Sequence, residues 1–167
     1  MNKLDTLISK LKECKDLALE LELDPDQVSG LLGEAVALKV IREVIGDHMY
    51  KPAPPREDNI DGTGLFGTYS VKFLTPKMHV KKSSERNLIK LHSDLNFDFL
   101  LVVCSTGEVF NIPREVIVNN SEVKLTERRK RKLINWMTRG SRNSYAIRPT
   151  NDNWQTMMDN YLVCTLK

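Results

Sequence analysis

The spacing of apolar residues predicts two helices at the start of the chain. Leucines and isoleucines recur every three or four residues across positions 3–22, which is the spacing of an amphipathic helix. Asp24 and Pro25 then supply a capping side chain and a proline suited to a first helical position. We expect a second helix to begin at Pro25 or Ser29 and to run to Gly46, because glycine readily adopts the left-handed conformation that ends a helix.

Short apolar runs and turn residues in the middle of the chain predict a β-hairpin. Residues 48–57 include several prolines, so they are expected to form an irregular connection. A strand at residues 59–61 should then lead through a glycine-rich turn into a second strand at residues 68–74. A helix capped by Ser83 or Ser84 is expected after this hairpin.

A near-continuous apolar run at residues 97–104 follows. Its sequence, FDFLLVVC, predicts a central strand that is covered on both faces. A Ser-Thr-Gly turn should lead from it into a further strand at residues 109–112.

The C-terminal part predicts a return to helices. We expect a helix from Thr126 to near Gly140, a short strand at residues 144–148, and a last helix capped by Asn151 or Asp152. Helices, then strands, then helices indicate an α/β (α+β) protein with a central mixed β-sheet flanked by helices.

The totals place these elements in one domain. A chain of 167 residues, 41% of them hydrophobic and 28% charged, is long enough for one domain with a full core and too short for two domains. Within it we distinguish N-terminal helices at residues 3–46, a hairpin and sheet core at residues 58–113, and a basic helical part at residues 124–167.

Cysteine usage and the lengths of the apolar runs bear on location. Cys14, Cys104 and Cys164 are odd in number, lie far apart and form no CxxC pair. This pattern argues against a disulfide framework or a zinc site and for a reducing, cytoplasmic compartment. No apolar run approaches the roughly 20 residues of a membrane helix, and the N-terminus lacks the apolar segment of a signal peptide. We therefore expect an intracellular protein without a membrane span.

The net charge of +3 hides a strong asymmetry. Residues 124–148 are rich in lysine and arginine and contain a single acid, Glu127, so the remainder of the chain is acidic. This separation predicts a basic face for a polyanion, with a solvated helix surface as the alternative. The residues that we expect to bind nucleic acid are Arg128, Arg129, Lys130, Arg131, Lys132, Arg139 and Arg142.

The most informative local pattern joins an acid to a lysine across the glycine-rich turn. Asp61 stands before this turn, and Ser70 and Lys72 stand on the strand after it. Because Ser70 and Lys72 are two residues apart, both project to one face of their strand. A carboxylate and an ammonium on neighbouring strands are the minimum needed to hold a metal ion beside a phosphate.

A second acid, Glu34, lies on the predicted second helix. By helical spacing it falls within the apolar stripe of Leu31, Leu38, Ile41 and Ile45. A carboxylate on a core-facing stripe is costly unless it is paired or binds a metal. Gly30 and Gly33 beside it indicate close approach of another backbone. A partly exposed Glu34 near the helix start is the alternative.

The order of Glu34, Asp61 and Lys72 resembles the PD-(D/E)XK nuclease superfamily, the fold of many restriction endonucleases and Holliday-junction resolvases. The resemblance covers roughly residues 31–113 and implies a restriction endonuclease-like fold. It implies that Asp61 and Glu34 bind a magnesium ion, or manganese as a substitute, and that the Val71 carbonyl completes the coordination. Lys72 would orient or activate the attacking water and stabilise the charge on the scissile phosphate.

Two positions complicate this resemblance. Ser70 stands where the family usually has Glu or Asp, and a neutral hydroxyl is a poorer ligand for a hard dication. Either Glu34 supplies the missing charge, or the protein binds nucleic acid without cutting it. Asp58 competes with Asp61 for the role of metal ligand, and we favour Asp61 because one tight hairpin joins it to Ser70.

The resemblance implies a metal-dependent endonuclease that hydrolyses phosphodiester bonds in double-stranded DNA, of the type II restriction kind. Cutting both strands calls for two sites, so we expect a homodimer, with the N-terminal helix as the contact. The alternatives are a nucleic-acid-binding module on the same fold without cleavage, and a protein-interaction domain whose basic helix meets an acidic partner.

Overall fold

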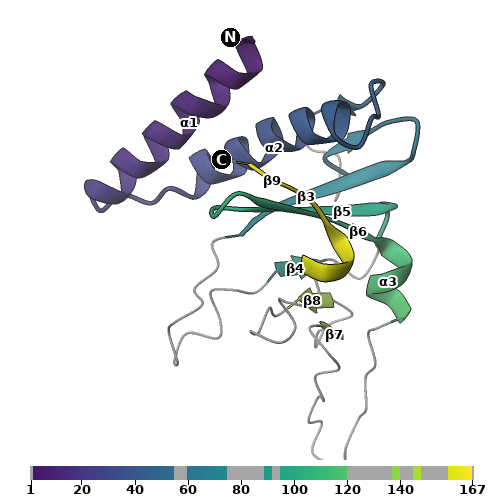
Figure 1. Ribbon diagram of the computed structural model, residues 1–167. Helices are drawn as coiled ribbons and strands as arrows, with labels where there is room; N and C mark the ends of the chain where they lie inside the picture. The colour runs from purple at the N-terminus through teal and green to yellow at the C-terminus, as the bar shows by residue number, and fades with distance from the viewer. Residues whose placement is uncertain are drawn as a thin grey trace, which may run out of the picture.

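A mixed β-sheet with helices on its faces forms the centre of the chain, as the computed structural model shows (Figure 1). The structure describes residues 2–54, 60–74, 89–91, 95–119, 137–139, 145–147 and 158–166. Across the main sheet, the six described strands follow the order β1 (Lys51–Pro52), β2 (Gly62–Thr63), β3 (Thr68–Leu74), β5 (Phe99–Cys104), β6 (Glu108–Pro113) and β9 (Leu162–Thr165). Among these strands β3 and β5 are parallel, and the other neighbours are antiparallel.

Helices and a second, smaller sheet cover the two faces of the main sheet. The described helices are α1 (Lys3–Glu20), α2 (Asp26–Glu43) and α3 (Arg114–Asn119). The smaller sheet has the order β4 (Ile89–Leu91), β8 (Tyr145–Ile147) and β7 (Met137–Arg139). In Figure 1, α1 and α2 lie above the main sheet, whereas α3 and the smaller sheet lie below it. The chain is therefore an α/β protein with a central mixed sheet flanked by helices, as its sequence predicts.

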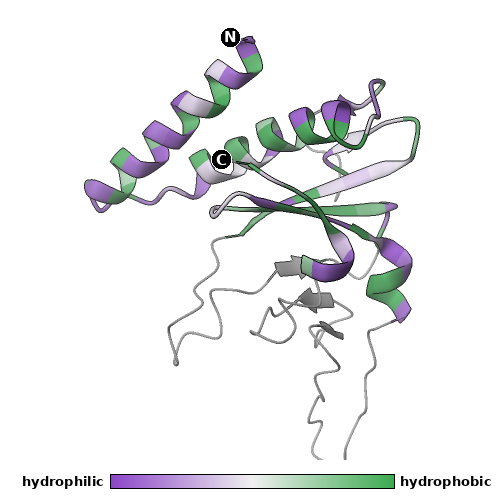
Figure 2. Cartoon of the chain, in the orientation of Figure 1, coloured by the Kyte–Doolittle hydropathy of each residue, from purple (hydrophilic) through white to green (hydrophobic). Residues whose placement is uncertain are grey.

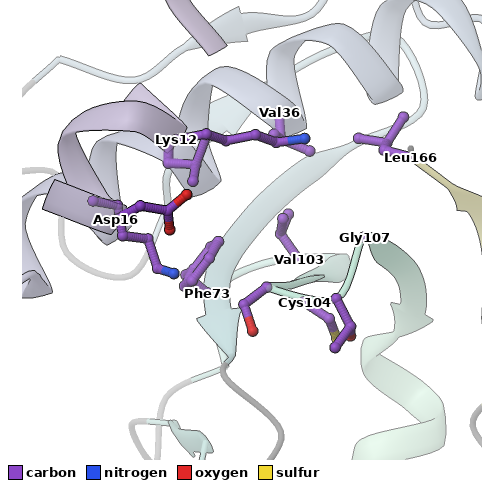
Figure 3. A pocket seen from close by; sticks show the side chains of 12 residues that line it. Lys12, Asp16, Val36, Phe73, Val103, Cys104, Gly107 and Leu166 are labelled. Atoms are coloured by element: carbon purple, nitrogen blue, oxygen red, sulfur yellow. The ribbon is translucent and has the colours of Figure 1, made fainter. Parts of the chain in front are cut away.

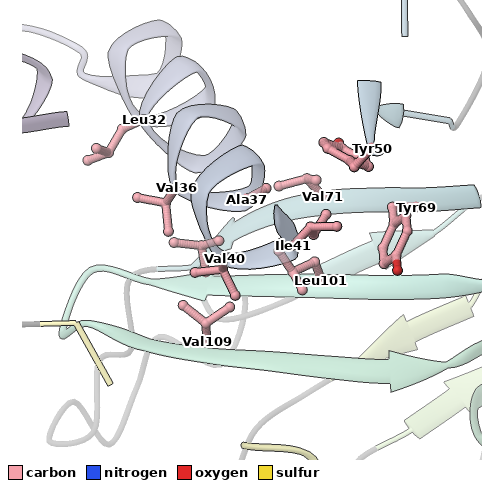
Figure 4. Packing of buried hydrophobic residues seen from close by; sticks show 11 residues of the cluster. Leu32, Val36, Ala37, Val40, Ile41, Tyr50, Tyr69, Val71, Leu101 and Val109 are labelled. Atoms are coloured by element: carbon pink, nitrogen blue, oxygen red, sulfur yellow. The ribbon is translucent and has the colours of Figure 1, made fainter. Parts of the chain in front are cut away.

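The face of the sheet under α2 carries one of two apolar cores. In Figure 4 the side chains of α2 point onto the strands below them. The buried residues of this core are Leu32, Val36, Ala37, Val40, Ile41, Tyr50, Tyr69, Val71, Leu101, Val103 and Val109. Since α2 contributes about half of them, its burial against the sheet is a main source of stability on this face.

The opposite face carries the second core. Its buried residues are Leu74, Leu91, Leu95, Phe97, Leu100, Val102, Cys104, Phe110, Ile112 and Ile117. Successive residues of β5 contribute alternately to the two cores, which explains why its sequence is an unbroken apolar run. Figure 2 shows this contrast: the central strands are hydrophobic over most of their length, whereas α1 alternates between hydrophobic and hydrophilic residues.

Most predicted elements of the first two thirds of the chain are confirmed. Both N-terminal helices lie within their expected ranges, and Gly46 has the left-handed φ of +86° that was expected after the second helix. The Asp24 Oδ1 accepts a hydrogen bond from the Asp26 N–H at 3.0 Å, but Pro25 is the cap residue of α2, so its expected place at the first helical position was wrong. The strands expected at residues 97–104 and 109–112 correspond to β5 and β6.

Several predictions about strands and helices were wrong. The first hairpin strand, expected at residues 59–61, is β2 at residues 62–63, so Asp61 precedes it. The connection expected to be irregular contains the short strand β1. The helix expected to run from Ser83 or Ser84 through Leu91 was wrong at its end, because residues 89–91 form β4 and pair with β8; positions 83–88 lie outside the described residues.

The C-terminal part differs in the same way. The helix expected to reach Gly140 does not include residues 137–139, which form β7 and pair with β8. The strand expected at residues 144–148 is confirmed as β8, and residues 158–161 are helical as expected. Neither α3 nor β9 was predicted. The short strands β7 and β9 form because they pair with strands elsewhere in the chain. The local spacing of apolar residues does not reveal such partners.

Candidate functional site

Asp61 lies beside β3, where the pairing of β3 with β2 ends. Its N–H donates to the Tyr69 carbonyl at 2.8 Å, and Gly62 is in register with the same Tyr69. Asp61 therefore stays bonded to β3 one residue before β2 begins, and its side chain lies beside the edge of β3.

The Asp61 carboxylate bonds to β3 through one oxygen. Oδ2 accepts hydrogen bonds from the Val71 N–H at 2.6 Å and from the Ser70 hydroxyl at 3.2 Å. Within the described part of the chain, Oδ1 accepts no hydrogen bond. The structure thus brings Asp61, Ser70 and Val71 together, and one oxygen of Asp61 is left to bind a ligand.

The Val71 carbonyl faces the same edge. In a strand, the N–H and C=O of one residue point to the same side, because antiparallel partners exchange both bonds. The Val71 N–H points to Asp61, so its carbonyl also projects from the side of β3 that faces β2. Since β2 pairs only with Thr68 and Tyr69, it does not cover this carbonyl.

Ser70 and Lys72 project from the face of β3 that lies away from α2. Ser70 is 1% exposed and Lys72 is half-buried. They alternate with Tyr69 and Val71, which belong to the core under α2. The one ion pair among the described residues joins Asp5 to Lys39, so the Lys72 ammonium has no carboxylate partner there.

Glu34 is exposed, and its predicted place on the core-facing stripe was wrong. The residues of α2 that are buried are Leu32, Gly33, Ala35, Val36, Ala37, Val40 and Ile41. Leu31, which was assigned to the buried stripe, is 49% exposed. Helical spacing is satisfied both by the predicted stripe, which includes Leu31, and by a neighbouring stripe, which includes Leu32. The stripe with Leu32 is the one that packs on the sheet. The exposed alternative for Glu34 is therefore the correct one.

The two glycines beside Glu34 have different environments. A Cβ built on Gly33 would lie 3.3 Å from the Phe73 Cβ, so α2 crosses β3 at close range at this point. A Cβ on Gly30 would meet nothing within 4 Å. The predicted close approach of another backbone is confirmed for Gly33 and wrong for Gly30.

Tyr50 lies beside Asp61. Its hydroxyl donates to the Asp61 carbonyl at 3.4 Å. Burial raises the pKa of Tyr50 most, and the negative charges of Asp61 and then Glu34 raise it further. Both carboxylates therefore lie within electrostatic range of the Tyr50 phenol.

The edge of β3 beside Asp61 offers few ligands for a metal ion. Among the described residues no group of three or more His, Cys, Asp or Glu side chains is placed to hold one. The donors are at most the carboxylates of Glu34 and Asp61 and the carbonyl of Val71. Magnesium in phosphate sites is bound by one or two carboxylates plus the substrate phosphates, so this set fits an ion that binds together with a phosphate.

Asp47, a buried acid that no sequence pattern singled out, anchors the turn between β2 and β3. It is 0% exposed, and its two oxygens accept hydrogen bonds from the Leu65 and Phe66 N–H groups, both at 3.0 Å. A Cβ on Gly64 would lie 2.1 Å from the Asp47 Oδ2, so this turn needs glycine. The one signal in the sequence is the glycine-rich turn itself, which leaves room for a side chain from elsewhere.

Hydrogen bonding sets the charge state of Asp47. Burial by itself raises the pKa of this carboxyl. Hydrogen bonds from the backbone N–H groups of Phe66, Leu65 and Met49 outweigh burial, so the pKa lies below its usual range. Asp47 is therefore a charged structural residue at neutral pH.

Asp98 holds the other side of the same turn. Its Oδ2 accepts hydrogen bonds from the Thr68 N–H and hydroxyl, both at 2.9 Å. These two bonds, the backbone one first, lower the pKa of Asp98. The turn thus presents Leu65 and Phe66, which are 74% and 56% exposed, on a firmly held backbone.

Other predicted site residues cannot be placed in this geometry. Those that lie outside the described residues are Asp58, Arg128, Arg129, Lys130, Arg131, Lys132 and Arg142. The backbone of Arg139 belongs to β7, and its side chain is outside the described part.

Two further findings bear on location and thiol chemistry. Cys14, Cys104 and Cys164 are free thiols, and burial raises the pKa of Cys104 and Cys164. No helix of the described ranges is both long and apolar enough to cross a membrane.

Comparisons with models of protein families, with curated proteins and with solved structures find no match to this chain.

Proposed function

We propose that this protein is a metal-dependent endonuclease that hydrolyses phosphodiester bonds in double-stranded DNA, on a restriction endonuclease-like fold of the PD-(D/E)XK superfamily. The observation that carries this proposal is the position of Asp61. Its carboxylate lies at the edge of β3, where Oδ2 accepts hydrogen bonds from Val71 and Ser70, and among the described residues Oδ1 accepts none. The charge of Glu34 acts on Tyr50, whose hydroxyl bonds to the Asp61 carbonyl, and Lys72 follows two residues after Ser70.

Each residue of this edge has a distinct part in the reaction. Asp61, Glu34 and the Val71 carbonyl would hold the metal ion. A bound magnesium ion supplies positive charge against the charge that builds on the scissile phosphate. The Lys72 ammonium, without a carboxylate partner among the described residues, would bind a phosphate oxygen and orient the attacking water. The Ser70 hydroxyl positions Asp61 through its hydrogen bond to Oδ2.

The surrounding protein would supply binding and symmetry. The basic residues between positions 128 and 142 would contact backbone phosphates, because such contacts dominate affinity for DNA. Cutting both strands requires two sites, which supports a homodimer with α1 as the contact. Exposed leucines on and just beyond α1 favour this surface: Leu7, Leu17, Leu19, Leu21 and Leu23. A cytoplasmic location fits the free thiols.

A second candidate is binding of nucleic acid without cleavage. Ser70 favours this candidate. Its side chain is 1% exposed and is hydrogen-bonded to Asp61. A carboxylate in place of this hydroxyl would bind a metal ion more strongly. In this case the same edge would serve as a binding surface alone.

The test is cleavage of a sequence-diverse pool of long duplexes in Mg²⁺ or Mn²⁺, since a restriction-type enzyme is silent without its recognition sequence. We expect fragments from the wild type and a loss of about 100-fold or more in Asp61→Asn and Lys72→Gln. Glu43→Gln and Lys10→Gln make the same charge changes at exposed positions away from this edge and should cleave normally.

Each outcome selects one interpretation. Cleavage that survives both Asp61→Asn and Lys72→Gln would show that the site lies elsewhere. Salt-sensitive binding of the pool without any cleavage would select the second candidate. A protein that neither binds nor cleaves the pool would refute both and leave a role in protein interaction.

A further inference from the structure

A cavity of about 300 Å³ lies on the α2 side of the sheet (Figure 3). It is bounded by α1, by α2, and by the ends of β3 and β5. Its apolar lining comes from Leu32, Val36, Phe73, Val103 and Leu166. A volume of this size is at the lower end of ligand sites and suits a small molecule.

The position of the cavity in the fold favours ligand binding. The parallel strands β3 and β5 end together at Leu74 and Cys104, and the cavity opens beside these carboxyl ends. Crevices at the carboxyl ends of parallel strands are the usual ligand sites of open α/β sheets. The turn after β5, residues 105–107, forms part of the rim.

The α1 side of the cavity is basic. Lys12 and Lys15 line it together with a single acid, Asp16. In Figure 3, Lys12 and Asp16 reach over the cavity from α1. The Lys15 ammonium lies 5.9 Å from the centre of the Phe73 ring. Neither lysine forms an ion pair with any described residue.

The packing of α1 leaves this space open. No residue of α1 is buried, and the ion pair between Asp5 and Lys39 ties its first turns to α2. Its later turns, which carry Lys12 and Lys15, stand over the cavity. A ligand in this cavity would contact both α1 and the sheet.

We propose that this cavity binds a small organic anion that carries an apolar ring or chain. The anionic head, a carboxylate or a phosphate monoester, lies between the ammonium groups of Lys12 and Lys15. The apolar body packs on Phe73 and Val36. This site is separate from the proposed nuclease site, because Ser70 and Lys72 project from the other face of β3.

The experiment titrates the full chain with naphthalene-2-carboxylate or phenyl phosphate and follows backbone amide signals by NMR. We expect shifts at residues 105–107 and at Leu166. The double variant Lys12→Gln/Lys15→Gln should weaken binding about tenfold. Lys3→Gln/Lys10→Gln removes the same charge from exposed positions of α1 that do not line the cavity, and should bind like the wild type.

A neutral analogue and the pattern of shifts make the result decisive. Naphthalene-2-carboxamide should bind more weakly than the carboxylate, because it lacks the charge for the two lysines. Equal affinity for amide and carboxylate, shifts confined to the exposed leucines of α1, or no shifts with either anion at millimolar concentration would each overturn the proposal. Binding of only one of the two anions would identify the preferred head group. These results do not depend on whether the protein cuts DNA.

Discussion

Asp47 and Asp61 lie at opposite ends of the β2–β3 hairpin, and each accepts hydrogen bonds from its backbone. Asp47 is fully buried and uses both oxygens, one for Leu65 and one for Phe66. Asp61 is half-buried and, among the described residues, uses Oδ2 alone. The number of occupied oxygens therefore separates a structural acid from a candidate ligand.

The comparison has a physical basis. A carboxylate that is buried must have its oxygens bonded, because burial of an unpaired charge is costly. Asp47 meets this condition within the protein, so a metal ion could enter only by breaking the turn. Asp61 can bind an ion through Oδ1 while Oδ2 keeps its bond to Val71. We expect substitutions of the two acids to have opposite patterns of effect on stability and function.

The largest effect should follow Asp47→Ala. This change removes the acceptors of at least two backbone hydrogen bonds to a charged group and frees the turn, so the free energy of unfolding should fall by about 3 kcal/mol. Urea unfolding followed by circular dichroism measures it. Asp26→Ala, at an exposed position in the first turn of α2, is the control and should cost less than about 1 kcal/mol. Equal losses in the two variants would remove the structural role of Asp47.

A pair of glycine substitutions sharpens the same point. The added Cβ in Gly64→Ala would meet the Asp47 carboxylate at 2.1 Å, and we expect a loss of about 2 kcal/mol in unfolding free energy. Gly30→Ala adds the same methyl group within α2 where nothing lies within 4 Å, so it should gain up to about 1 kcal/mol. Thermal unfolding of both variants measures the difference. A neutral Gly64→Ala would show that the turn does not need Asp47 in its observed place.

Three features of the structure could be predicted from the sequence: the strand β5, the close contact of Gly33 and the nearness of Asp61 to Ser70. The apolar run FDFLLVVC identifies β5 because a strand buried on both faces has no polar alternation. The close contact predicted for Gly33 is confirmed, because α2 packs against Phe73 at this position. A glycine inside a helix often marks such close packing. Asp61 was expected on a strand and precedes it instead, yet its predicted nearness to Ser70 is confirmed by their hydrogen bond.

Other features depend on tertiary partners that no local pattern records. Glu34 fell on the wrong face because stripes through Leu31 and Leu32 both satisfy helical spacing, and the sheet decides between them. Asp47 was missed because its donors, at Leu65 and Phe66, are distant in sequence. The end of a predicted helix, residues 137–139, is the strand β7, because it pairs with β8.

The third prediction separates stability from function at Asp61. In Asp61→Asn the side-chain carbonyl can still accept the Val71 N–H, so unfolding free energy should change by no more than about 1 kcal/mol. Under the proposed function, the same variant loses metal-dependent cleavage. Chemical unfolding and the cleavage assay on one preparation test both parts. A loss as large as that of Asp47→Ala would make Asp61 a second structural acid and count against its role as a metal ligand.

The smallest effect is the pH dependence of the Asp47 contribution. The pKa of Asp47 is lower in the folded protein than the value of about 3.9 in unfolded chains. Its stabilisation is therefore fully present above the unfolded pKa and is lost as the pH falls through the folded pKa. The gap in unfolding free energy between the wild type and Asp47→Asn should stay constant above about pH 5 and shrink below about pH 4. Urea unfolding across pH 3–7 measures this gap, and a gap that widens toward low pH would mean that Asp47 is protonated in the fold.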